Sequence, residues 1–134
     1  ANTLSLGVLK SMGFQGAFVS PELGKHDFFS LPSQSPIPLG VVASGLWPLC
    51  VSRIHPKNYA PMQPVMSPKG EMAWTAIYGD NRWVFPNWKL DIAPKRRALE
   101  KAGFRTFVNF VEPVPSGIHL KKRPGLWNWN FERL

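Results

Sequence analysis

Three short apolar runs, each ending at a turn, set the pattern of this chain. The main run covers residues 39–42 and ends at Ser44 and Gly45, and the others cover residues 17–19 and 107–111. An uninterrupted apolar run with β-branched residues is typical of a strand that is buried on both faces. A segment with helical spacing that ends in glycine precedes the first and the third runs along the chain. This alternation predicts an α/β fold in which three parallel strands are joined by crossover helices.

Both predicted helices have start and stop signals of their own. Asn2 is suited to cap a first helix that stops at Gly13. The second helix begins at Asp91 or Ala93 and ends at Gly103. The apolar positions at helical spacing, which we expect to face the core, are Leu4, Val8, Leu9 and Met12 in the first helix and Ile92, Leu99 and Ala102 in the second.

The hydrophobic period changes in the middle of the chain. From Met72 to Tyr78 the residues alternate with a period of two, and residues 82–85 answer them across a Gly-Asp-Asn turn. This pattern predicts a β-hairpin, which we place as an insertion at residues 71–86. Residues 54–69 contain four prolines and no clear period, so they predict a long loop over the end of the sheet.

Composition favours one folded domain with a basic surface. The chain has 134 residues, of which 44% are hydrophobic, and we take residues 1–134 as a single α/β domain. A formal charge of +8 is compatible with acidic partners such as nucleic acid, although the ordinary solubility of a basic domain is the preferred explanation. No run reaches the roughly 20 apolar residues that span a bilayer, so no membrane partner is expected.

Cys50 is the only cysteine of the chain. No intrachain disulfide can therefore form, and a reducing, cytoplasmic location is expected. Because Cys50 lies in an apolar run, we expect a buried packing residue rather than a reactive nucleophile.

Three segments together resemble the collagenase-like peptidases of family U-thirty-two. They are residues 9–23 with a Ser-Pro-Glu-Leu turn, residues 38–53 with a Gly-x-x-Pro-Leu-x-x-Ser-Arg run, and residues 90–111 with a helix ending in Ala-Gly. The resemblance implies the later portion of a TIM-like barrel, and a proteolysis-related hydrolase acting on a peptide or protein. Three strands cannot close a barrel, so we expect residues before Ala1 and either another subunit or an N-terminal barrel half as partner.

The sequence departs from the iron-sulfur members of that family. Those members place a cysteine after the Ser-Arg pair, where this chain has Ile54, and three further cysteines beyond it. An iron-sulfur cluster needs about four thiolate ligands, and this chain offers one. His26, His55 and His119 are too scattered to indicate a zinc site, so no cofactor and no metal are expected.

Glu22, Arg53 and His55 are the candidate catalytic residues. Glu22 follows a predicted strand at the edge where barrels keep their chemistry, and it either serves as a base or ligand or only accepts backbone N–H bonds in the turn. Arg53 is suited to bind a carboxylate or phosphate at two points, and His55 titrates near neutral pH. The alternatives are an arginine paired with a buried carboxylate and an exposed loop histidine.

A second candidate function is non-catalytic nucleic-acid binding, or an accessory role in RNA modification. Two basic triplets, residues 95–97 and 121–123, favour it, and Trp127, Trp129 and Phe131 follow the second triplet. Positive charge next to aromatic faces is typical of single-strand binding. The alternating aromatics fit equally a terminal strand that packs on the core.

Overall fold

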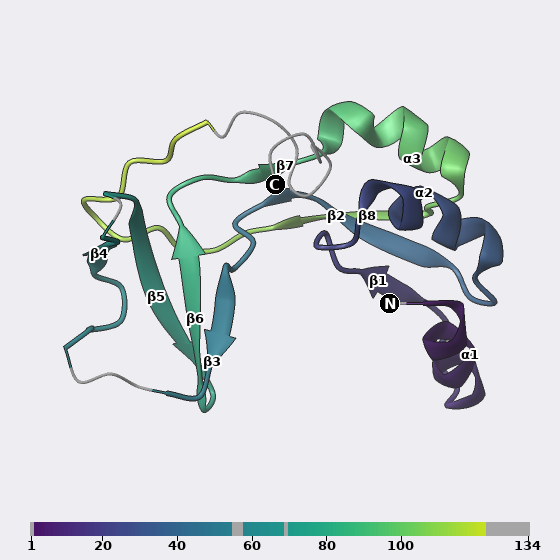
Figure 1. Cartoon of the computed structure of the whole chain (residues 1–134), viewed down its shortest axis with the longest axis horizontal. Helices are drawn as coiled ribbons and strands as arrows, with labels where there is room; N and C mark the ends of the chain where they lie inside the picture. Colours follow the sequence, from purple (N-terminus) through teal and green to yellow (C-terminus); the bar gives the residue numbers. More distant parts are fainter. Residues whose placement is uncertain (1, 55–57, 69, 123–134) are drawn as a thin grey trace. The chain divides into compact units, whose positions relative to one another are not determined.

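The described part of the chain forms two compact units (Figure 1). The computed structural model describes residues 2–54, 58–68 and 70–122. Within these, the first unit comprises residues 2–44 and 91–109, and the second comprises residues 45–90 and 110–122.

The first unit contains the helices and a sheet centred on β2. Its elements are α1 (Thr3–Ser11), β1 (Ala17–Val19), α2 (Lys25–Gln34), β2 (Leu39–Gly45), the 3-10 turn η1 (Ala93–Lys95), α3 (Arg96–Ala102) and β8 (Thr106–Phe110). β1 pairs with β2 in parallel, with Ala17 opposite Leu39 and Val19 opposite Val41. β2 also pairs with β8 and with the short β7 (Leu90–Asp91), so it has neighbours along both edges. Val41 is fully buried as a result.

Aromatic packing joins α2 and α3 in the first unit. The rings of Phe28 and Phe104 lie 5.0 Å apart, and both side chains are buried together with Leu99. Gly103 ends α3 in the left-handed conformation at φ 113°, where a side chain would press on Pro32. The stop that the sequence predicts at this glycine is thereby confirmed.

The first helix is capped as predicted but turns a different face inward. The Ser5 backbone N–H donates to Asn2 Oδ1 at 2.8 Å, which confirms the cap. Leu6 is the buried residue of α1, whereas Leu4 and Met12 are 82% and 66% exposed. The predicted core face of this helix is therefore wrong, because the rest of the described first unit covers the Leu6 side instead.

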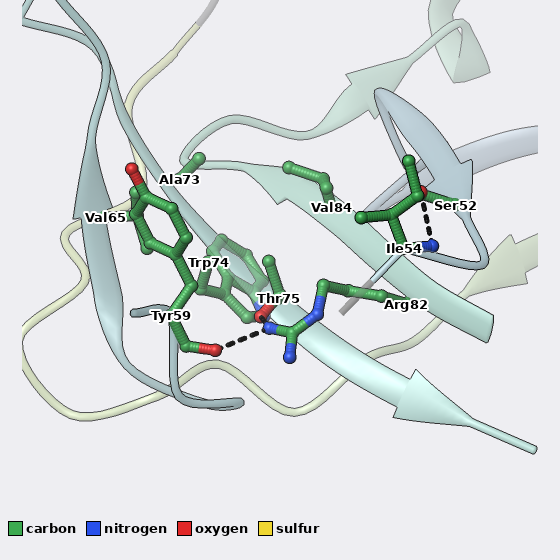
Figure 2. Close-up of a pocket in the computed structure, with 9 residues that line it drawn as sticks. All are labelled: Ser52, Ile54, Tyr59, Val65, Ala73, Trp74, Thr75, Arg82 and Val84. Carbon is green, nitrogen blue, oxygen red and sulfur yellow. Dashed lines mark hydrogen bonds between the residues drawn. The ribbon is translucent and has the colours of Figure 1, made fainter. Parts of the chain in front are cut away.

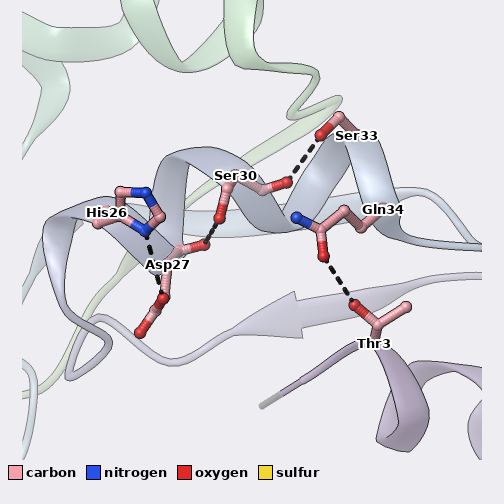
Figure 3. Close-up of polar contacts among 6 residues, drawn as sticks. All are labelled: Thr3, His26, Asp27, Ser30, Ser33 and Gln34. Atoms are coloured by element: carbon pink, nitrogen blue, oxygen red, sulfur yellow. Dashed lines mark hydrogen bonds and ion pairs between the residues drawn. The ribbon is translucent and has the colours of Figure 1, made fainter.

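Polar contacts tie the ends of α1 and α2 together (Figure 3). Thr3 Oγ1 donates to Gln34 Oε1 at 3.2 Å. Ser30 Oγ and Ser33 Oγ donate to the carbonyl oxygens three residues before them, those of Asp27 and Ser30. These hydroxyl groups satisfy backbone carbonyls of their own helix, so they have a structural role.

The second unit is built on an antiparallel sheet. Its strands, in sheet order, are β3 (Cys50–Ser52), β6 (Asn81–Pro86), β5 (Met72–Tyr78) and β4 (Pro64–Met66). Every neighbouring pair in this sheet is antiparallel. β5 and β6 are adjacent through the turn at Gly79 and lie where the period-two alternation predicts a hairpin.

The prediction of a partial TIM-like barrel is wrong. A barrel of this type alternates parallel strands with helices, whereas the described residues hold two sheets, three α-helices and the antiparallel β3–β6–β5–β4 sheet. Two strands contribute to the difference: β4 lies in the proline-rich residues 54–69, where a loop is predicted, and β3 pairs with β6 in the antiparallel sheet. Strand pairing depends on contacts distant in sequence, which local apolar runs do not report.

Candidate functional site

Glu22 lies in the turn that follows β1 in the first unit. Its side chain is exposed, and its backbone N–H donates to Ser20 Oγ at 3.3 Å. The Ser-Pro-Glu-Leu segment is therefore a local turn in which a serine hydroxyl accepts from the backbone. Glu22 stays a candidate site residue on the resemblance alone.

Arg53 follows β3 in the second unit, and its side chain is exposed. The preceding Ser52 accepts a hydrogen bond from the Ile54 backbone N–H at 2.9 Å. Glu22 belongs to the first unit and Arg53 to the second. His55 lies outside the described residues.

Cys50 opens β3 and is exposed rather than buried. The expectation of a buried packing residue is wrong because β3 is an edge strand of its sheet, so its run of apolar residues is not enclosed.

The basic residues 95–97 are exposed on the first unit. Arg96 Nε lies 2.8 Å from Glu100 Oε1, and its guanidinium stands 4.7 Å above the ring of Phe107. Lys95 and Arg97 extend into solvent beside this pair. In the second unit Lys121 and Lys122 are exposed, while the aromatic residues 127–131 and Arg123 lie outside the described residues.

Metal-ligating residues do not gather within the described ranges. Among those residues, no three His, Cys, Asp or Glu side chains lie close enough together to hold a metal ion. His26 Nδ1 is 3.6 Å from Asp27 Oδ1, with both side chains largely in solvent (Figure 3). The helices of the described part are also too short or too polar to cross a bilayer.

A pocket lies on one face of the β3–β6–β5–β4 sheet (Figure 2). Pairing places Ser52 opposite Arg82 and Thr75 opposite Val84, so these residues share a face. We call it the pocket face, and its members around the cavity are Ser52, Val65, Ala73, Thr75, Arg82 and Val84. Ile54 and Tyr59 border the same cavity, which has a volume of about 370 Å³.

Arg82 is the notable side chain of this pocket because it is a buried cation. It is only 6% exposed, and its Nη1 donates to the Tyr59 carbonyl oxygen at 2.7 Å and to Thr75 Oγ1 at 2.8 Å. Its buried Nε has no hydrogen-bond partner within the described residues. No described carboxylate forms an ion pair with Arg82. Burying an unpaired charge costs free energy, so such groups are usually paired.

The two bonds of Nη1 fix the orientation of the guanidinium. Both acceptors are neutral oxygens, one from the chain that covers the sheet and one from the neighbouring strand β5 (Figure 2). Nε is itself enclosed by protein atoms and has no acceptor among the described residues, so this donor is unsatisfied. The pocket therefore presents a fixed positive charge to any anion that enters it.

Sequence reasoning did not identify Arg82 as a site residue. One signal was present: in the alternating pattern, Arg82 falls on the same face as Val84, Ala73 and Thr75, a face without acidic residues. The cover over this face could not be predicted, since the Tyr59 carbonyl comes from a segment with no period. The structure thus adds Arg82 to the candidate site residues.

Comparison with protein-family models, curated proteins and solved structures finds no match to this chain. The resemblance to collagenase-like peptidases therefore stays a prediction from the residues quoted above. The pocket is therefore the basis for proposing a function.

Proposed function

We propose that this protein is a binding protein whose second unit holds a small anionic ligand in the Arg82 pocket. The observation that supports this is an arginine that is only 6% exposed, whose guanidinium is held by two neutral acceptors and pairs with no described carboxylate. A ligand carboxylate or phosphate would supply the missing negative charge. Charge-assisted hydrogen bonds of this kind are about twice as strong as neutral ones.

Nuclear magnetic resonance of the arginine side chains tests the proposal directly. Acetate, phosphate and sulfate are titrated into the protein while the Nε–H signals are followed. We expect the Arg82 signal, identified as the one missing in Arg82→Gln, to move and saturate with at least one anion. The exposed signals should move little.

Arg105→Gln is the matched control because it removes the same charge from an exposed position in the first unit. We expect it to keep anion binding, whereas Arg82→Gln loses it. An Arg82 signal that no anion shifts, or equal loss in both variants, overturns the proposal.

A peptidase activity, with a cytoplasmic location and a peptide or protein substrate, remains a prediction from the family resemblance. Peptide hydrolysis by the purified chain that falls sharply in Glu22→Gln would support it. Hydrolysis that is unchanged in both Glu22→Gln and Arg53→Gln would remove these residues from consideration.

Nucleic-acid binding is a second candidate, favoured by the exposed Lys95, Arg97 and Lys101 around α3. These cations lie close together in sequence, and Glu100 pairs with Arg96 rather than with them. Binding of this type weakens steeply as salt rises, because phosphate contacts release counterions. Replacing all three by Gln should lower both the affinity for single-stranded RNA and the salt dependence. An unchanged affinity argues against this surface.

A further inference from the structure

The geometry points to a narrower ligand class: a monocarboxylate that carries an apolar body. This inference rests on the proposed function, since it names the anion for the same pocket. It draws on the walls of the cavity and on its charge balance, which the proposed function does not use.

The walls around Arg82 are mostly apolar. Val65, Ala73 and Val84 project from three neighbouring strands, and Ile54 and the Tyr59 ring border the cavity from outside the sheet (Figure 2). Apart from Arg82, the side-chain polar groups of the lining are the hydroxyls of Ser52, Thr75 and Tyr59 and the indole of Trp74.

Three of these four groups already have a partner or stack on the opposite face of the sheet. Thr75 Oγ1 accepts from Arg82, and Ser52 Oγ accepts from the Ile54 backbone N–H. Trp74 stands between Ala73 and Thr75 in β5, so its side chain projects from the opposite face of the sheet. There its indole stacks on Phe85. A ligand that fills the space beyond the guanidinium therefore meets mainly hydrocarbon, and an apolar body fits it.

The charge balance favours a carboxylate over a phosphate. One guanidinium offers one positive charge, and no other described cation lines the cavity. A carboxylate carries one negative charge and fits the planar two-point geometry of arginine. A phosphate monoester, with nearly two charges and three strong acceptor oxygens, would leave charge and acceptors unpaired in this pocket.

The volume of about 370 Å³ lies at the small end of ligand sites. Two sources supply the same chemistry: a free aliphatic or aromatic acid, and the carboxyl terminus of a peptide with an apolar last residue. Separate probes represent the free acid and the peptide carboxyl terminus.

Calorimetric titration of the full chain with a homologous series tests the inference. The probes are acetate, butanoate and hexanoate, with hexanamide as the neutral analogue and hexyl phosphate as the dianionic one. We expect each methylene that enters the pocket to raise the affinity about fourfold. Hexanoate should bind at least about tenfold more tightly than hexanamide, because the amide lacks the charge that Arg82 pairs with.

Acetyl-leucine and an acetylated hexapeptide ending in leucine distinguish the two sources. Similar affinity for both indicates that a peptide terminus can enter. Tight binding of hexanoate with no binding of the hexapeptide indicates a free acid. Both outcomes support a monocarboxylate with an apolar body.

Two variants test separately the contribution of the Arg82 charge and the contribution of the apolar wall to ligand affinity. Arg82→Met should bring hexanoate and hexanamide to similar affinities, while Arg105→Gln should leave them apart. Val65→Ser should reduce the gain from acetate to hexanoate and leave acetate binding within about twofold. Circular dichroism and thermal unfolding of each variant show whether it is folded.

The failures are distinguishable. If acetate or phosphate binds at Arg82 but affinity does not rise with chain length, or if hexyl phosphate binds more tightly than hexanoate, the inference is wrong and the proposed function stands. If no anion of the series binds and the Arg82 Nε signal stays fixed, the proposed function is wrong as well.

Discussion

The two faces of the β3–β6–β5–β4 sheet are made by the same strands and differ in almost every respect. On one, the aromatic face, Trp74 stacks on Phe85 at 5.6 Å, and Trp83 lies 6.4 Å from Phe85. Leu46 and Ile118 complete this buried cluster. The pocket face instead carries Arg82 and a cavity of about 370 Å³.

We expect the aromatic face to stabilise this unit, whereas the pocket face is the one that we propose to bind a ligand. Because side chains of a strand alternate between faces, the neighbouring residues Arg82 and Trp83 lie on opposite faces of the sheet. The aromatic face gains from burial and ring contacts. The pocket face holds a charge that lacks a carboxylate within the described residues, so we expect it to contribute little to folding; under the proposed function it pairs with a ligand anion.

The largest effect is expected on the aromatic face. Phe85→Ala removes a fully buried ring that contacts both Trp74 and Trp83, and it leaves a cavity. We expect the free energy of unfolding to fall by about 3–5 kcal/mol. Urea unfolding followed by tryptophan fluorescence and circular dichroism measures it. Val84 precedes Phe85 in β6 and lies on the pocket face. We expect Val84→Ala to lower the free energy of unfolding by less than half as much as Phe85→Ala. Equal losses in the two variants would contradict the difference between the two faces.

Local patterns predicted part of this architecture. The period-two alternation from Met72 to Tyr78 marks β5, and the Asn2 cap and the Gly103 stop lie at their predicted helix ends. These signals are local because they depend on a turn, a cap or a left-handed glycine. The barrel was wrong because β3 and β4 join their sheet through pairings that no local signal reports.

The candidate site was harder to predict for a related reason. The sequence points to Glu22 by its place after a predicted barrel strand, and to Arg53 by the ability of its guanidinium to bind a carboxylate or phosphate at two points. The sequence pattern places Arg82 in a hairpin strand and does not indicate that it is buried. Its burial depends on the Tyr59 carbonyl, which lies 23 residues away along the chain.

A smaller effect is expected at Thr75, which is 6% exposed on the pocket face. Thr75→Val keeps the shape but removes the acceptor for Arg82 Nη1, leaving a buried charged donor with one bond fewer. We expect a loss of about 1–2 kcal/mol in unfolding free energy. In an Arg82→Met background the same change should cost almost nothing, since the donor is absent. A full loss in that background would show that Thr75 does not act through Arg82.

Arg82→Met itself should change stability less. The substitution removes two hydrogen bonds of Nη1 and, at the same time, relieves the burial of a charge without a carboxylate partner. These contributions oppose each other, so we expect the free energy of unfolding to stay within about 1 kcal/mol of the original. Urea unfolding in ligand-free buffer measures it. A loss as large as that of Phe85→Ala would mean that Arg82 is a structural residue of the fold.

The smallest effect is expected at the edge of the aromatic face, where Tyr78 meets Trp83 edge-to-face at 5.9 Å. The Tyr78 hydroxyl donates to Glu112 Oε2, and this bond, with burial and the carboxylate charge, raises the pKa of Tyr78 above its ordinary value of 10.0. A raised pKa means that the protonated form is favoured in the folded state. The stabilisation is therefore fully present below the unfolded pKa and is lost as pH rises through the folded pKa.

Tyr78→Phe should accordingly lower the free energy of unfolding by about 0.5 kcal/mol or less at neutral pH, because the hydrogen bond is exposed and weakened by solvent. The difference between the two proteins should vanish at a pH above the folded pKa of Tyr78. Alkaline titration of tyrosinate absorbance checks the cause: subtracting the Tyr78→Phe curve from the original isolates one tyrosine, whose midpoint should lie above 10.0. Glu112→Gln should bring that midpoint back toward the ordinary value, and a midpoint unmoved by this change would show that Glu112 does not hold the proton on Tyr78.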